Sequence, residues 1–180
     1  MGKIFHFAFV VMVTTAIATG ILASLNFATQ GRIKEMDLKT QMEARKSALP
    51  EAVKFDEKKS IKCGNSSFIP GYNQNGEITG YVSTVKAQGY GANGIVFVLG
   101  VSKDAKIKGL KITDVTTETP GLGTNVLREE WQKHWAGKDE SYEFDKSKDG
   151  FAGATISPKG VYTGIKAKLK DFKSISVSQK

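Results

Sequence analysis

The chain has 180 residues, of which 40% are hydrophobic, and a formal net charge of +8. This length fits one soluble domain with an accessory segment, since domains typically run to about 100–200 residues. The basic residues are spread along the chain, without the basic and aromatic clustering of a nucleic-acid-binding module. We therefore interpret the charge as a solvated basic surface and expect no nucleic-acid partner.

The chain offers little for disulfide or metal chemistry. Cys63 is the only cysteine, and the two histidines, His6 and His134, lie far apart in the sequence. A single cysteine excludes an internal disulfide, and no Cys/His cluster has metal-ligand spacing. The polar run around Cys63 predicts an unpaired loop thiol. We expect no metal site and no catalytic residue, so any redox chemistry must come from an organic cofactor or a partner subunit.

The N-terminal segment is strongly apolar. Residues 4–28 contain no acidic or basic residue apart from a possible charge on His6, and these 25 residues suffice for a helix across a hydrocarbon core about 30 Å thick. Threonine hydroxyls within it can bond back to the helix. The alternative is a cleaved signal peptide, because Ala16-Ile17-Ala18 resembles a cleavage site. Cleavage there would leave an apolar stub, so residues 1–28 are predicted to be a retained transmembrane anchor in contact with membrane lipid.

Charge alone does not decide which side of the membrane the rest of the chain occupies. Lys3 precedes the apolar segment, whereas Arg32, Lys34 and Lys39 follow it closely. The positive-inside rule, taken alone, places the large domain in the cytoplasm. That rule weakens when a long domain follows, because long segments translocate largely regardless of charge.

Beyond the anchor, the pattern predicts a stalk and then a domain. Residues 29–50 are rich in helix formers and are predicted to form a helical stalk that ends at Pro50. Residues 51–180 are assigned to the domain, with residues 51–67 loop-like. A hairpin is expected over residues 68–87 around Asn75-Gly76, whose preferred turn is the mirror-image type.

The remaining elements point to an α+β domain with a mostly antiparallel sheet and flanking helices. Strands are predicted over residues 95–101 and 106–115, with a short one at 142–144. A helix is predicted over residues 126–135, capped by Thr124 or Asn125. The last helix is expected over residues 158–172, with Ser157 as its cap and Pro158 at its first position.

Residues 149–155, Asp-Gly-Phe-Ala-Gly-Ala-Thr, form a small-residue loop before the last helix. Taken alone, such a loop is most simply a tight turn. It also suits a phosphate, because Thr155 presents a hydroxyl and the helix that follows directs its free N–H groups toward an anion. Lys159, in the first turn of that helix, adds positive charge.

A second loop, Glu118-Thr119-Pro120-Gly121-Leu122-Gly123-Thr124, joins a predicted strand to a predicted helix. Proline and glycine make it a plausible connector. Leu122, however, is an apolar residue between two glycines. It can press on the flat face of a ring while the glycines allow the backbone to approach closely.

Together with Gly89-Tyr90-Gly91, these two loops resemble, in order and spacing, the FMN-binding domain of bacterial membrane redox complexes. The resemblance covers roughly residues 1–172. It is strongest to the G subunits of the Rnf ion-translocating ferredoxin:NAD oxidoreductase. The related C subunit of the sodium-pumping NADH:quinone oxidoreductase, which is usually longer, is the alternative.

The resemblance implies that FMN is bound covalently, through a phosphoester to Thr155, by a dedicated flavin transferase. The chain departs from the usual pattern at Ala152, where a Ser or Thr is common. It further implies an electron-carrier subunit of a translocase that couples ferredoxin:NAD electron transfer to Na⁺ or H⁺ movement. Its domain is then expected on the outer, periplasmic or extracellular, face of the cytoplasmic membrane. The candidate cofactor-binding residues are Glu118, Thr119, Leu122, Gly123, Thr124, Gly153, Ala154 and Thr155.

Two functions of other classes also fit an apolar N-terminal helix followed by a β-rich domain. One is a pilin-like structural protein, although residues 4–28 lack the acidic residue that would favour it. The other is an anchored module that binds its ligand reversibly. Retention of a flavin after denaturation distinguishes the covalent carrier from both.

Overall fold

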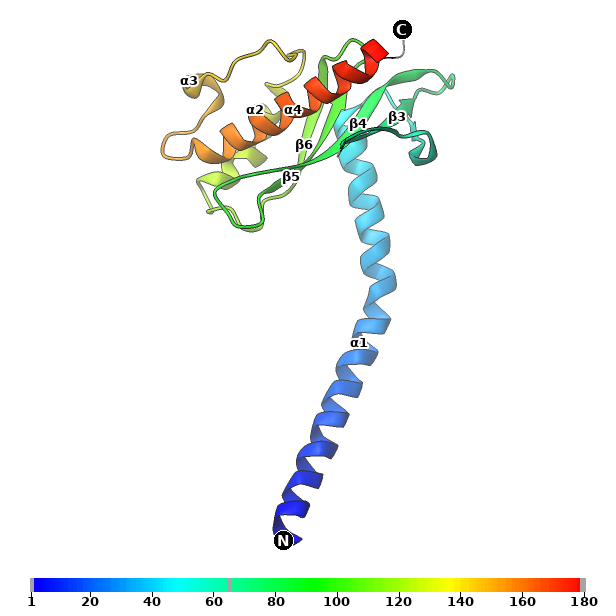
Figure 1. Ribbon diagram of the computed structural model, residues 1–180, viewed down its shortest axis with the longest axis vertical. Coiled ribbons are helices and arrows are strands. Elements are labelled where there is room, and N and C mark those ends of the chain that lie inside the picture. The colour runs from blue at the N-terminus through cyan, green and yellow to red at the C-terminus, as the bar shows by residue number, and fades with distance from the viewer. Residues whose placement is uncertain (1, 65, 179–180) are drawn as a thin grey trace. The chain divides into compact units, whose positions relative to one another are not determined.

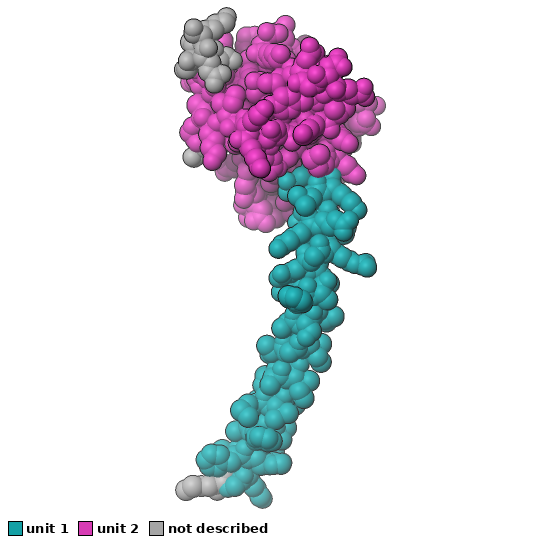
Figure 2. Space-filling model, turned by 90° about the vertical axis from the view of Figure 1, so that its right-hand side faces the viewer, with its two compact units in different colours: residues 1–41 teal, residues 42–180 magenta. Residues whose placement is uncertain are grey.

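The computed structural model describes residues 2–64 and 66–178, which fall into two compact units, residues 1–41 and 42–180 (Figure 2). Helix α1 (Gly2–Ala48) makes up the first unit and extends into the second. It ends two residues before Pro50, as expected, because the residue before a proline is disfavoured in the helical conformation. The helix is continuous through residue 28, so the division between anchor and stalk remains a prediction from composition.

The apolar part of α1 is long and hydrophobic enough to cross a membrane. None of its apolar window is buried within the protein, and side chains such as Ile4, Phe9 and Leu22 are exposed. The hydroxyls of Thr14 and Thr19 donate to backbone carbonyls one turn earlier, at 3.0 and 2.8 Å. These polar groups are therefore satisfied within the helix.

The second unit is built on an antiparallel sheet with the order β1-β3-β4-β5-β6, in which β2 also pairs with β3 (Figure 1). The α+β class is confirmed. The predicted strands at residues 95–101 and 106–115 are confirmed, the first of them residue for residue. The strands are β1 (Lys54–Phe55), β2 (Ile61–Cys63), β3 (Ser66–Tyr72), β4 (Ile78–Ala87), β5 (Ile95–Val101) and β6 (Ile107–Asp114).

The first half of the domain differs from the expectation in two details. Residues 51–67 contain β1, the 3₁₀ helix η1 (Glu57–Lys59) and β2, so Cys63 lies in a strand and is half-buried rather than in a loop. The predicted mirror-image turn is also wrong. Among the described residues only Gly76 of that turn has a positive φ, and the Asn73 side chain accepts hydrogen bonds from two backbone N–H groups, closing a longer loop.

Both faces of the sheet are covered. Helix α4 (Ile156–Ser178) packs across β4 and β5 on one face (Figure 1), where its predicted apolar side chains Val161, Ile165, Leu169 and Phe172 are all buried. On the other face, Ala44, Ala48 and Leu49 pack with Val82 and Val98. The backbone at Ala48 lies very close to β5, because a Cβ atom added at Gly100 would lie 2.0 Å from the Ala48 carbonyl oxygen.

The helices near the second loop are shorter than predicted. Residues 126–135 divide between the 3₁₀ helix η2 (Gly123–Leu127) and α2 (Glu129–Lys133), whose N-cap position is Arg128 rather than Thr124 or Asn125. Residues 142–144 form no strand; they precede α3 (Lys146–Asp149). The cause is visible in the side chains, because this segment is held by polar contacts to a buried carboxylate rather than by a β-ladder.

Helix α4 begins two residues earlier than expected. Ser157 therefore lies inside the helix, and Pro158 is its third residue rather than its first. The Ser157 hydroxyl does not cap the helix; it donates to the Glu118 carboxylate at 2.5 Å. Pro158 is still within the first turn, where its missing N–H removes no intrahelical hydrogen bond.

Candidate functional site

The two loops singled out in the sequence line one cavity of about 340 Å³ at the N-terminal end of α4. Thr119, Leu122 and Gly123 form one wall. Gly153, Ala154 and Thr155, which lie about 30 residues further along the chain, form another wall. Six of the eight candidate residues thus share one concave surface.

Thr155 stands immediately before the first residue of α4. Its carbonyl oxygen accepts the first helical hydrogen bond, from the Lys159 N–H at 3.1 Å, so it occupies the N-cap position. The residue is half-buried. Within residues 2–64 and 66–178, its hydroxyl makes no hydrogen bond. The hydroxyl is therefore available to react at the cavity wall.

Glu118 lies behind the cavity rather than in its wall. Its side chain is buried, and one carboxylate oxygen accepts a hydrogen bond from the Gly91 N–H at 3.0 Å. The other accepts from the Ser157 hydroxyl at 2.5 Å. One carboxylate thus joins the glycine-rich loop, the Leu122 loop and helix α4. A Cβ at Gly123 would lie 2.1 Å from this carboxylate, so a larger residue there would displace the Glu118 side chain.

Thr124 also supports the loop without lining the cavity. Its hydroxyl accepts a hydrogen bond from the Gly121 N–H at 2.9 Å, and the Asn125 amide donates to the Gly121 carbonyl at 2.8 Å. Gly121 has a φ of 74°, a conformation that favours glycine. These bonds hold the turn that presents Leu122, whose side chain is 43% exposed.

Three residues outside the candidate set complete the cavity wall: Tyr90, Ile156 and Ser157. Tyr90 belongs to the Gly-Tyr-Gly segment that contributes to the resemblance, so its position there is the signal that identifies it. Nothing in the pattern around Ile156 distinguishes it from other apolar helix residues. No charged side chain is among the nine described residues that line the cavity.

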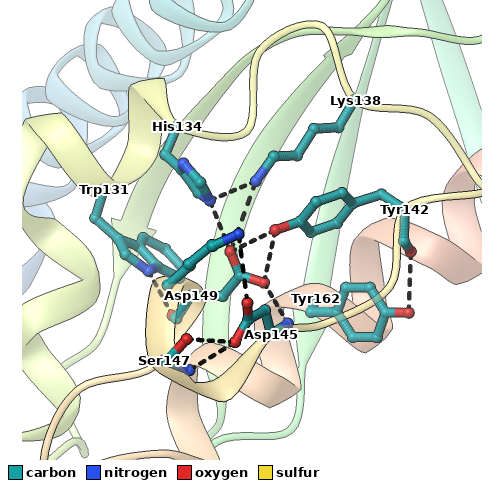
Figure 3. A network of polar contacts seen from close by, with 9 residues as sticks. Trp131, His134, Lys138, Tyr142, Asp145, Ser147, Asp149 and Tyr162 are labelled. Atoms are coloured by element: carbon teal, nitrogen blue, oxygen red, sulfur yellow. Dashed lines mark hydrogen bonds and ion pairs between the residues drawn. The ribbon is translucent and has the colours of Figure 1, made fainter.

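The loop that carries Thr155 is fixed at its start by Asp149, which is fully buried. The Asp149 carboxylate accepts hydrogen bonds from the Tyr142 hydroxyl at 2.8 Å and from the Asp145 N–H at 2.8 Å (Figure 3). The His134 ring nitrogen lies 2.6 Å away, and the Lys138 ammonium 3.6 Å away. Sequence reasoning placed Asp149 in the motif but assigned it no role.

This cluster changes the acidity of its members. Burial acts to raise the pKa of Asp149, but the hydrogen bonds from Asp145, Tyr142 and His134, with the charge of Lys138, outweigh it and lower that pKa. Burial and the hydrogen bond to Asp149 raise the pKa of Tyr142 to about 12. The carboxylate is therefore held in its charged form at neutral pH, as the anchor of the segment before Thr155.

Comparison with known proteins places the chain in a family. The family model of the FMN-binding domain matches residues 89–170. The G subunit of the Na⁺-translocating ferredoxin:NAD⁺ oxidoreductase complex of Acetobacterium woodii is 30% identical over 196 aligned residues, which cover 96% of this chain and 93% of that protein. The G subunit of the ion-translocating oxidoreductase complex of Methanosarcina acetivorans is 30% identical over 165 residues, 86% of each chain.

A solved structure shares the fold. The crystal structure of Shewanella oneidensis NqrC superposes with a TM-score of 0.50 at 17% sequence identity, covering 73% of this chain and 74% of that one. This likeness concerns the fold alone, whereas the sequence identity to the G subunits extends over nearly the whole chain. The chain belongs to the family of G subunits of ion-translocating oxidoreductase complexes.

Proposed function

We propose that this chain is an electron-carrier subunit of a membrane complex that couples ferredoxin:NAD electron transfer to Na⁺ or H⁺ translocation, and that it carries FMN on Thr155. Membership of the G-subunit family and the match to the FMN-binding domain support the role. The observation that carries the site is the single cavity shared by the Leu122 loop and Thr155, although 37 residues separate Thr155 from Glu118 at the start of that loop.

The cavity suits a planar ring. Its volume of about 340 Å³ falls within the range of small-molecule sites, about 300–1,000 Å³. Leu122 and Tyr90 offer apolar and aromatic surface to the face of a ring, and Gly123 and Gly153 leave room for close approach. Thr119 and Ser157 supply hydroxyls for its polar edge. Glu118 and Thr124 are proposed to act from behind, by holding these walls in place.

Attachment requires one hydroxyl and one phosphate. The Thr155 oxygen forms a bond to the flavin-bearing phosphorus as the phosphoanhydride bond from that phosphorus to a second phosphate group of the flavin donor breaks. The second phosphate leaves with the rest of the donor and the hydroxyl proton is released, so the chain gains one FMN less one water. The negative phosphoester then lies at the N-terminus of α4, where helix N–H groups favour anions by typically about 0.3–1 kcal/mol. A flavin transferase is the proposed partner for this step.

When bound, the flavin supplies the redox chemistry, and the protein supplies binding, orientation and shielding from water. The other subunits of the complex are its proposed electron donors and acceptors. Helix α1 is the proposed membrane anchor, with lipid around its apolar residues. We place residues 51–180 on the outer face of the membrane, as the FMN-binding domain.

The test is the mass and fluorescence of the denatured chain, purified from a host that has the flavin transferase. We expect fluorescence on a denaturing gel and a mass increase of one FMN less a water. Thr155→Val should abolish both while leaving the fold intact, because it removes one hydroxyl and preserves shape.

The matched control is Thr163→Val, the same change on the exposed side of α4. This control should keep the full adduct. An unmodified chain from native membranes, or a Thr155→Val chain that remains fluorescent, would contradict covalent attachment at Thr155.

A further inference from the structure

Apolar side chains are exposed around the mouth of the flavin cavity. Tyr90 is 70% exposed, Ile156 56% and Leu122 43%, and all three line the cavity. In the proposed function a flavin in the cavity covers part of this surface. Contiguous exposed apolar surface next to a binding site is typical of an interaction surface.

Two grooves adjoin the mouth of the cavity at Ile156, which lines the cavity and both grooves. We call the first the α4 groove; it has a volume of about 430 Å³ and includes Lys86 and Lys159. The second, the α3 groove, has a volume of about 890 Å³ and includes Lys146 as well as Thr155. Positive charge therefore surrounds the apolar mouth on both sides.

Negative charge is nearly absent from the same surface. Asp145 in the α3 groove is the one carboxylate among the described residues that line the mouth and the two grooves. Its carboxylate already accepts hydrogen bonds from the N–H and the hydroxyl of Ser147, at 2.9 and 2.6 Å. Lys148 lies 3.6 Å from it. By contrast, Lys146 and Lys159 form no ion pair with any described residue, and Lys86 lies within electrostatic range of Asp114 without forming an ion pair among those residues.

We propose that this mouth is the docking surface for another subunit of the same complex, one that presents an apolar centre surrounded by carboxylates. The inference rests on the proposed function, because it takes the cavity to hold the flavin. Complementary charge steers such encounters and fixes their orientation, and apolar contact at the centre excludes water.

The position of the cavity favours a protein over a lipid surface. Behind the cavity, the buried Glu118–Ser157 contact and the core close off the flavin. The mouth is therefore the side on which the redox centre of a partner can come closest to the flavin, and a lipid surface offers no such centre.

The first test reverses charge in the assembled complex. The variant Lys86→Glu with Lys146→Glu changes one exposed lysine in each groove. Its control is Lys103→Glu with Lys170→Glu, which makes the same charge change at the far end of β5 and about 20 Å along α4. Complex is purified from native membranes through a tag on this chain. Co-purifying subunits, covalent flavin per chain and ferredoxin:NAD turnover are then measured at two salt concentrations.

We expect the groove variant to lose about tenfold in turnover or in co-purifying subunits at low salt, about 1.4 kcal/mol, because its new carboxylates repel those of the partner. About 0.5 M salt should recover part of the loss through screening. The control should behave as wild type. Normal flavin content with unchanged assembly and turnover would overturn the docking surface while leaving the proposed function intact. A wild-type chain without flavin would instead contradict the proposed function.

The second test identifies what covers the surface. A photo-crosslinking amino acid in place of Thr163, which lines the α4 groove, is compared with one in place of Lys170. Irradiation of native membranes should link position 163 to a redox-centre-bearing subunit of the complex, and position 170 should not form that link. Crosslinking of position 163 to phospholipid instead would show a membrane contact and overturn the proposal.

Discussion

At the scale of single residues, the proposed function gives Thr155 and Leu122 separable tasks. Both line the cavity; Thr155 is proposed to offer the hydroxyl for attachment, and Leu122 to offer apolar surface on the facing loop. Burying a leucine side chain completely is worth about 1.5–3 kcal/mol, and Leu122 is 43% exposed without a ligand. In the proposed site its contact with a ring is therefore worth a part of that amount.

Replacing Leu122 with Ala should leave the flavin attached but more mobile. The gel fluorescence and the adduct mass should equal those of the wild type, while fluorescence anisotropy falls, the visible spectrum shifts and complex turnover decreases. Leu127→Ala is the matched control, because Leu127 is also about half exposed, at 47%, and does not line the cavity. If both variants have the same anisotropy, Leu122 has no role in holding the ring.

The sequence motifs indicated which residues belong to the cavity region better than they indicated what each side chain does there. Thr155 and Leu122 could be chosen because their chemistry is visible in their neighbours, a hydroxyl before a helix and an apolar side chain between glycines. The task of Glu118 could not be predicted. It depends on Gly91 and Ser157, which lie 27 and 39 residues away, so only the folded chain shows that its carboxylate joins three segments.

At the scale of elements, the loop that carries Thr155 is held between α3 and α4. Helix α4 fixes its end, and the Asp149 cluster fixes its start. Trp131 adds to this cluster, since its ring N–H donates to the Asp149 carbonyl at 2.7 Å and its ring packs against Phe151. The position of Thr155 therefore depends on a charged, fully buried side chain six residues earlier.

The charge of Asp149 should make stability depend on pH. Its folded-state pKa is lowered, so its contribution is present above the unfolded value of about 3.9 and is lost as pH falls through the folded value. At neutral pH, Asp149→Asn should lower the free energy of unfolding by about 2–3 kcal/mol, because hydrogen bonds to a buried charge are lost. The deficit relative to wild type should shrink as pH falls from about 6 to about 3.

Thermal or urea unfolding of the full chain in detergent measures this difference. Asp104→Asn, an exposed change in the turn between β5 and β6, should stay within about 0.5 kcal/mol of wild type at every pH. A deficit for Asp149→Asn that is constant across the range would show that the shape of Asp149, and not its charge, holds the loop.

Elements whose pattern is local were predicted well, and those fixed by distant contacts were not. Strand β5 follows from a nearly continuous apolar run that is buried on both faces, and helix α4 follows from the spacing of apolar residues that bury one face. Residues 142–144 look like a strand because Tyr142 and Phe144 alternate with a charged residue. Their true partners are Asp149 and Tyr162 rather than another strand, and no local pattern reveals this.

At the scale of the whole molecule, the two units differ in how much of their apolar surface is exposed. The apolar residues of α1 are exposed, whereas those of the sheet and α4 form a closed core. A helix that is hydrophobic on all sides is stable only when another apolar phase surrounds it. The apolar part of α1 is therefore suited to a membrane, whereas the second unit has a closed core suited to water.

The chain should remain in the membrane fraction after carbonate extraction and begin at Met1 or Gly2. Thr19 at the mature N-terminus would instead show cleavage after Ala18.

The side of the membrane on which the domain lies can be measured with Asp104→Cys in a Cys63→Ser background, because Cys63 itself is half-buried beside Ser174. An impermeant maleimide should label this cysteine in intact cells stripped of any outer membrane. Labelling only after lysis would place the domain in the cytoplasm.

The walls of the cavity also impose an order on biosynthesis. They come from residue 90, from residues 119–123 and from residues 153–157, and the Glu118 carboxylate joins them only when α4 lies on the sheet. A ribosome must therefore have released almost the entire chain before the cavity around the Thr155 hydroxyl is complete. In the proposed function, cofactor loading therefore follows the folding of the domain, and a chain truncated before α4 is expected to receive no flavin.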